Sequence, residues 1–130
     1  MKNTASMFIM LGTLGVFNLA QAEGPDAAAI KQMYDTARNT SGLVNYCVDK
    51  GFLKADSSEN AKKMVAYVAG VPGGVDTTGG DKLEAYGREG KVHGGDGQYL
   101  PLEGNVPQGV EAWCKDAGEG LRQGLKSVGL

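Results

Sequence analysis

The sequence has few of the residues on which catalytic and metal sites usually depend. In 130 residues it contains one histidine and two cysteines, and the cysteines do not form a Cys-x-x-Cys pair. Two such cysteines favour a structural disulfide over a redox or metal site, and His93 alone then leaves too few ligands for zinc. Gly-x-Ser-x-Gly elbows, phosphate-binding glycine loops and EF-hand loops are also absent. We therefore expect no metal, no cofactor and no enzymatic activity.

Clusters of basic residues and long hydrophobic runs are lacking as well. The 13 Lys and Arg residues are scattered among 15 Asp and Glu residues, whereas phosphate binding needs clustered cations. The sequence thus predicts no nucleic acid partner and no attachment to an anionic membrane surface. No stretch after the first 22 residues approaches the roughly 20 apolar residues that span a bilayer.

The first 22 residues have the pattern of a cleaved secretory signal peptide. Lys2 precedes an apolar run from Met7 to Leu19, and residues 20–22 (Ala-Gln-Ala) form a small-x-small cleavage site. Cleavage would leave residues 23–130 as a single helical domain with 12 basic and 15 acidic residues, a net charge of −3. We expect an exported protein, periplasmic or secreted, that has no membrane anchor after cleavage.

Apolar residues at three- and four-residue intervals predict three main helices. Their approximate ranges are 25–50, 57–69 and 107–128. Residues 40–42 (Thr-Ser-Gly) interrupt the first apolar stripe. This leaves two interpretations, one kinked helix or two helices with a break between them.

Particular residues indicate where these helices begin and end. Gly51 followed by Phe52 is typical of a helix C-terminus. Asp56 with Glu59 predicts a variant capping box at the start of the second helix. Pro107 is expected in the first turn of the last helix.

Cys47 and Cys114 lie on the apolar faces of the first and last helices, so a bond between them would join the two ends of the domain. The last helix is also expected to contain Gly109, Gly118, Gly120 and Gly124. These glycines predict either the close approach of another backbone or fraying after Cys114. Close packing inside the domain is favoured over contact with a partner. The predicted core comprises Ile30, Met33, Tyr34, Ala37, Val44, Cys47, Val48, Phe52, Ala61, Met64, Val65, Val68, Val110, Trp113, Cys114, Ala117 and Leu121.

The segment 71–106 is rich in glycine and has no long periodic stretch. Residues 81–86 predict one or two helical turns. Residues 91–93 and 98–100, on either side of a four-residue turn, predict a small β-hairpin. The expected fold class is therefore mainly α, a small disulfide-stapled bundle of three main helices with a glycine-rich insertion that contains a short helix and a β-hairpin.

This architecture resembles that of two kinds of small exported helical protein with one long-range disulfide. They are periplasmic acid-stress chaperones and periplasmic immunity proteins of type VI secretion, and neither shares a motif with the chain. The leading hypothesis is a non-catalytic exported protein that binds another protein. The alternatives are a small-ligand or envelope-stress binder and, as a minor one, a carboxylate-based hydrolase that uses residues of segment 76–103. The carboxylate pairs available to such a hydrolase are Glu84 with Glu89 and Asp96 with Glu103.

A binding surface is expected in the glycine-rich segment, because surface loops on a rigid scaffold often carry recognition. The candidate residues are the aromatic and basic side chains together with one exposed leucine, since aromatic residues and arginine are enriched at binding hot spots. They are Tyr86, Arg88, His93, Tyr99 and Leu100. The alternative is that Tyr99 and Leu100 only cover the open end of a small core.

Overall fold

The computed structural model describes residues 26–94 and 96–130. Within these ranges the elements are α2 (Ala27–Asp49), α3 (Asp56–Ala69), α4 (Gly80–Arg88), β1 (Lys91–His93), β2 (Tyr99–Pro101) and α5 (Val110–Ser127). The two strands pair in antiparallel fashion, with His93 opposite Tyr99. The predicted fold class is confirmed. The predicted signal peptide lies outside the described residues, and none of the described helices has the length and apolar character that a membrane span requires.

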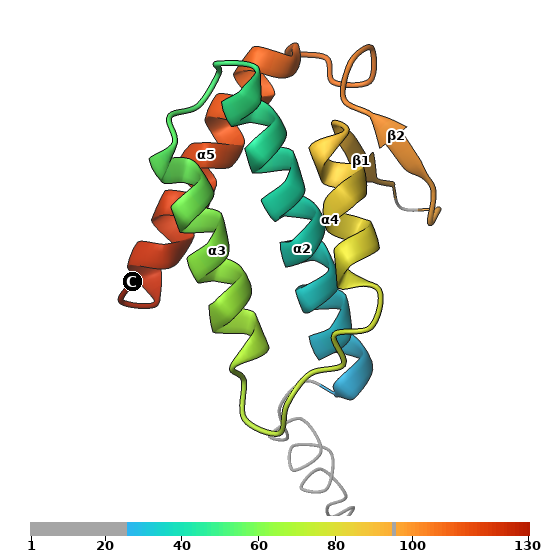
Figure 1. Ribbon diagram of the computed structural model, residues 1–130, viewed down its shortest axis with the longest axis vertical. Coiled ribbons are helices and arrows are strands. Elements are labelled where there is room, and N and C mark those ends of the chain that lie inside the picture. The colour runs from blue at the N-terminus through green and yellow to red at the C-terminus, as the bar shows by residue number, and fades with distance from the viewer. Residues whose placement is uncertain (1–25, 95) are drawn as a thin grey trace, which may run out of the picture.

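Helix α2 is the central element, with α3 and α5 on one side of it and α4 and the hairpin on the other (Figure 1). Its first turn is capped by the side chain of Asp26, which accepts a hydrogen bond from the backbone. At its other end Gly51 adopts a φ of +82°, and the N–H groups of Gly51 and Phe52 donate to carbonyl oxygens of the last turn at 2.9 Å. This pair of hydrogen bonds, with a left-handed glycine, is the helix C-terminus that the sequence predicted.

Helix α2 continues through residues 40–42 without a break, so the two-helix alternative is wrong. Gly42 is buried because α4 crosses it. A Cβ atom on Gly42 would lie 2.9 Å from the Cα of Gly87, and a Cβ on Gly87 would lie 2.8 Å from the Cα of Gly42. The two glycines therefore form a backbone-to-backbone contact between helices and do not interrupt α2.

Two other predicted helix starts differ from the structure. Helix α5 begins at Val110 and not at Pro107, because Gly109 has a φ of +90° and ends the preceding turn. Helix α3 begins at Asp56, after Ala55 with no side-chain cap. The predicted capping box is wrong, since Asp56 already lies inside the first turn.

The hairpin and the short helix occur where the sequence placed them, with shifted ends. Helix α4 extends over Gly80–Arg88, longer than the predicted 81–86. Strand β2 starts at Tyr99, one residue later than predicted. The predicted strand residue Gln98 closes the turn instead, because its carbonyl oxygen accepts from the N–H of Gly94 at 2.7 Å.

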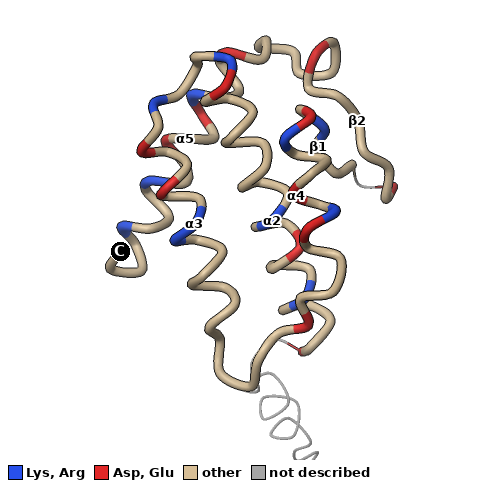
Figure 2. The backbone as a smooth tube through the Cα atoms, in the orientation of Figure 1, with Lys and Arg blue, Asp and Glu red and all other residues tan. Residues whose placement is uncertain are grey.

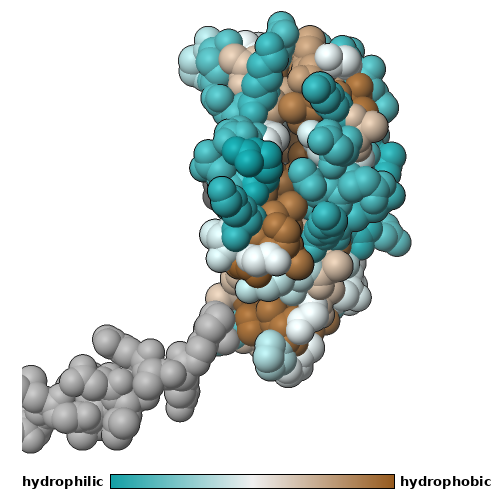
Figure 3. All heavy atoms as spheres, turned by 90° about the vertical axis from the view of Figure 1, so that its left-hand side faces the viewer, coloured by the Kyte–Doolittle hydropathy of each residue, from teal (hydrophilic) through white to brown (hydrophobic). Residues whose placement is uncertain are grey.

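The core lies between α2, α3 and α5. It is built from Val44, Ala61, Leu121 and Leu125, against which Leu53 and Met64 pack. Seen from the side of α3 and α5, hydrophobic side chains form a stripe between two bands of hydrophilic ones (Figure 3). Burial of these apolar side chains is the main force that holds the three helices together.

The predicted core contains one clear error and omits three leucines. Met33 is 50% exposed, because no described element packs directly on the face of α2 that carries it. Leu43, Leu102 and Leu125 are buried although the predicted core did not include them. Of the three, only Leu125 belongs to a predicted apolar stripe, that of the last helix.

The glycines of α5 divide into two kinds. A Cβ on Gly118 would lie 2.8 Å from the side chain of Leu53, and a Cβ on Gly124 would lie 3.3 Å from that of Met64. Close packing is thus correct for these two positions. Gly120 differs, because nothing lies within 4 Å of the place where its Cβ would be.

The predicted disulfide joins Cys47 of α2 to Cys114 of α5 across 67 residues of sequence. Both cysteines are fully buried, which fits a structural bond. Disulfides form and persist where the environment is oxidising. The bond therefore indicates a non-reducing location for the folded chain.

Candidate functional site

A groove opens along the face of α2 that the other helices leave uncovered. We call it the α2 groove, and its volume is about 1060 Å³. Its floor is formed by α2 between Ala28 and Leu43. One edge comes from α5, through Trp113 and Gly120 among others, and the other comes from Leu83 of α4 and the hairpin. The second half of α3 contributes Met64 and Val68 at the apolar end.

Small side chains form part of the floor and of the α5 edge. Ala28, Ala29 and Ala37 line the groove on α2, and Ala117 and Gly120 line it on α5. Short side chains let an incoming molecule approach the helix backbones closely. The groove is therefore hollow because these positions lack bulk, and its shape is fixed by rigid helices.

Charge is nearly absent from the groove. Lys31 and Asp35 are the only Lys, Arg, Asp or Glu residues among the described residues that line it. Their side chains pair at 3.3 Å, and the Lys31 ammonium also donates to the carbonyl oxygen of Thr78 at 2.8 Å. The lining thus offers mainly apolar surface and no free charge of either sign.

Three of the five predicted binding residues come together at the hairpin edge. The rings of Tyr86 and Tyr99 lie 4.4 Å apart, and those of His93 and Tyr99 lie 5.1 Å apart. His93 and Tyr99 line the α2 groove. Burial, followed by the charge of Asp35 and the proximity of Tyr86, raises the pKa of Tyr99. A tyrosine hydroxyl is protonated at neutral pH even at its ordinary pKa, so the Tyr99 hydroxyl can donate a hydrogen bond.

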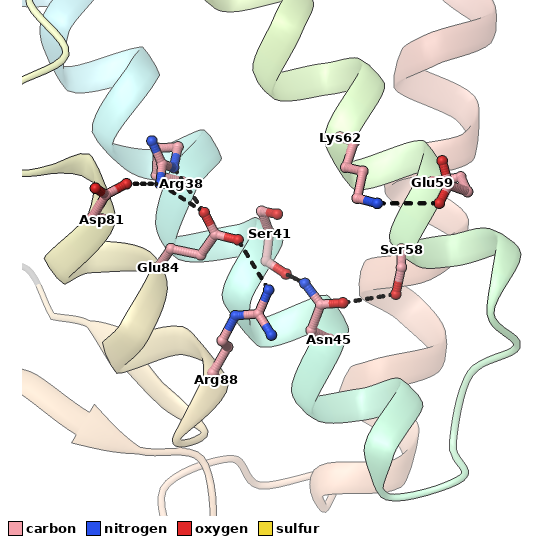
Figure 4. Close-up of polar contacts among 9 residues, drawn as sticks. All are labelled: Arg38, Ser41, Asn45, Ser58, Glu59, Lys62, Asp81, Glu84 and Arg88. Atoms are coloured by element: carbon pink, nitrogen blue, oxygen red, sulfur yellow. Dashed lines mark hydrogen bonds and ion pairs between the residues drawn. The ribbon is translucent and has the colours of Figure 1, made fainter.

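The other two predicted residues lie apart from this aromatic cluster. Arg88 pairs with Glu84 at 3.5 Å and lies in the seam between α2 and α4 (Figure 4). Leu100 is 41% exposed and stands opposite Val92 in the hairpin register. Neither Arg88 nor Leu100 lines the groove.

A buried asparagine holds the hairpin against α2. The Asn39 side-chain amide donates to the carbonyl oxygens of Leu83 and Lys91, both at 3.1 Å. Its oxygen accepts from the N–H of His93 at 3.4 Å. Because a buried polar group is costly unless it is bonded, these three bonds fix the groove edge that carries the aromatic cluster.

Ion pairs hold α4 in place on the same side of α2. The Arg38 guanidinium donates to Asp81 at 2.5 Å, to Glu84 at 2.9 Å and to the hydroxyl oxygen of Tyr34 at 2.8 Å (Figure 4). The side chains of Arg38 and Glu84 are 16% and 21% exposed, so solvent screens this pair less than it would on an open surface. Asp81 is 99% exposed, and its pair with Arg38 is screened by solvent. Together with the glycine contact these bonds fix the position from which α4 supplies Leu83.

The carboxylates proposed for the hydrolase alternative have other partners. Glu84 is bonded to Arg38, and Glu89 pairs with Lys91 at 2.9 Å. Asp96 accepts from the backbone of the turn, and Glu103 accepts from the Tyr46 hydroxyl at 3.5 Å. A general acid needs a desolvated carboxyl group, and none of these four residues lines the groove.

The alanines of the floor were not recognised in the sequence as candidates, because Ala28 and Ala29 have no chemistry that marks a site. For Gly120, on the α5 edge, the sequence left a contact with a partner open, although close packing inside the domain was favoured. The signal that could have identified the alanines is the shortage of bulky apolar residues in the first half of α2, where the stripe depends on Ile30, Met33 and Tyr34.

Comparisons with protein-family models, with curated proteins and with solved structures found no match to the chain.

Proposed function

We propose that the protein is a non-catalytic binding protein and that it holds a segment of another protein in the α2 groove. The observation that carries this proposal is the groove itself, a hollow of about 1060 Å³ on the uncovered face of the central helix. Exposed apolar surfaces with this shape are typical of binding sites.

The groove is preformed, which favours binding without a large ordering cost. Rigid helices form its floor and one edge, and the three bonds of Asn39 hold the hairpin at the other edge. The disulfide supports a periplasmic or secreted location for this activity, as does the signal-peptide pattern of the first 22 residues.

Gly120→Leu tests the proposal, because it fills the groove without disturbing the core. Gly120 is exposed, and the place of its Cβ is open. A leucine there would project into the groove, and it would also raise helix propensity by up to about 1 kcal/mol. We expect the variant to melt at or above the wild-type temperature and to recover at least tenfold less partner from an envelope extract in a quantitative pull-down.

Lys115→Leu is the matched control. Lys115 is an exposed residue of the same helix that does not line the groove, and the change adds the same side chain elsewhere. We expect it to recover partner as the wild type does. Equal recovery by Gly120→Leu and the wild type would contradict a binding site in the groove.

A second candidate function is the binding of a small apolar ligand. It is favoured by the groove volume of about 1060 Å³, which is close to the upper limit of roughly 1,000 Å³ for small-molecule pockets. In that case the mature protein purified from cells would carry an apolar molecule detectable by mass spectrometry after extraction with organic solvent, and Gly120→Leu would carry less of it.

A further inference from the structure

We infer that the α2 groove takes one amphipathic α-helix of a partner protein, which lies along α2 with an uncharged apolar face turned inward. This inference rests on the proposed function and specifies the partner. The structural feature behind it is a bundle in which α2 has packed neighbours on two sides and an open third side.

The length of the groove suits a helix. Its α2 lining runs from Ala28 to Leu43, and at a rise of 1.5 Å per residue this corresponds to about 22 Å, or roughly four helical turns. The groove also follows a helix with α5 along one edge, so an added helix would pack as the fourth member of a bundle.

The floor has small side chains on either side of one exposed methionine. Ala29 and Ala37 lie four residues before and after Met33, which lines the groove and is 50% exposed, so a partner helix would contact the Met33 side chain and approach the backbone of α2 beside it. Packed helix axes lie about 8–10 Å apart, and the smaller distances need small side chains at the contact. Ala29 and Ala37 of α2 and Gly120 of α5 supply such positions. Gly42 and Gly87 make a contact of this kind between α2 and α4 within the same molecule.

The groove offers no unpaired cation for the anionic headgroup of a fatty acid or phospholipid among its described lining residues. A cation free to pair would favour an anionic carboxylate or phosphate headgroup, and Lys31 is the only Lys or Arg among the described lining residues. Its ammonium group is bonded to Thr78, pairs with Asp35 and lies 3.9 Å from Asp76. Figure 2 shows no charged residue on the part of α3 that follows Lys63, and this part borders the groove through Met64 and Val68. An uncharged helix face complements this surface.

The two edges of the groove differ in polarity and so orient the helix. The hairpin edge carries His93 and Tyr99, near the Lys31–Asp35 pair. The α5 edge carries Trp113, Ala117 and Leu121. The polar margin of a bound helix would therefore face the hairpin, and its apolar face would lie against α2 and α5.

Site-specific crosslinking can measure the conformation of the bound segment. A photoreactive amino acid is placed in turn at Ala28, Gln32 and Thr36, which are exposed groove positions four residues apart on α2. Each step along α2 covers about 6 Å. If the bound segment is a helix, the crosslinked position in the partner's sequence shifts by about four residues for each step along α2. If the segment is extended, it shifts by about two residues. The same amino acid at Lys63, an exposed residue of α3 outside the groove, is the control.

The full mature chain is irradiated in an envelope extract, and the crosslinked partner residues are mapped by mass spectrometry. We expect crosslinks to one segment of one protein, advancing by three to four residues per step, and none of these from position 63. A two-residue advance would overturn the helix while leaving groove binding intact. Crosslinks only to lipid, or only to a second copy of the chain, would also overturn it. If the groove positions and position 63 capture the same proteins, or if no position captures any, the proposed function fails with the inference.

Discussion

Replacement of both Cys47 and Cys114 with alanine is expected to lower the free energy of unfolding by about 4 kcal/mol. The bond closes a loop of 67 residues, and a closed loop of this length restricts the unfolded chain by about that amount in the chain-entropy model. For a domain of this size the corresponding fall in Tm is on the order of 15–30 °C. Thermal melts followed by far-UV circular dichroism measure it directly.

Reduction of the wild-type protein provides the control, because it removes the bond without changing the sequence. The reduced protein and the double alanine variant should melt within a few degrees of each other. A double variant that melts as the oxidised wild type does would show that the link between α2 and α5 contributes nothing to stability.

Gly42→Ala is expected to destabilise the protein by about 3 kcal/mol, which is the high end for an overpacked site. The new Cβ would collide with the backbone of α4, close to the carbonyl oxygen of Glu84 and the Cα of Gly87. Backbone atoms cannot turn aside as a side chain can, so α4 has to shift. Urea denaturation measures the change, and Gly87→Ala should have a similar effect.

Gly120→Ala is the matched control, with the opposite sign. It is also a glycine-to-alanine change inside a helix, but the place of its Cβ is open, so helix propensity predicts stabilisation by about 0.5–1 kcal/mol. If Gly42→Ala also stabilises the protein, the close contact between α2 and α4 does not exist.

The elements that depend on local pattern could be predicted from the sequence. Periodic apolar residues identified the three main helices, and Gly51 with Phe52 identified the end of α2 because a left-handed cap is a local property. The pairing of Cys47 with Cys114 followed from there being only two cysteines. The cap of α3 was predicted wrongly, because Ala55 takes a helical conformation and Asp56 falls inside the first turn.

The contacts between distant segments could not be predicted in this way. Gly42 was interpreted as an interruption, since its partner Gly87 is far away in the sequence and lies in a segment without periodicity. Leu102 is fully buried, yet it is an isolated apolar residue in the glycine-rich segment and belongs to no pattern. Met33 continues the apolar stripe of α2 beyond the part that other described elements cover.

The groove belongs to this second class. Its lining comes from α2, α3, α4, both strands and α5, so it exists only once these elements are packed. The sequence analysis did predict His93 and Tyr99, which line the groove, because aromatic side chains in a glycine-rich surface segment are typical of binding sites. It grouped Arg88 with them in one binding surface, whereas the ion pair with Glu84 directs Arg88 toward the seam between α2 and α4.

Amide hydrogen exchange of the protein with and without its bound partner tests the central claim most directly, because it reports where the partner lies without any substitution. We predict slower exchange in the first half of α2, in the hairpin and in the part of α5 around Gly120, with unchanged exchange in the first half of α3. Protection confined to the outer surfaces of α3 or α4, with the first half of α2 unaffected, would contradict binding in the α2 groove.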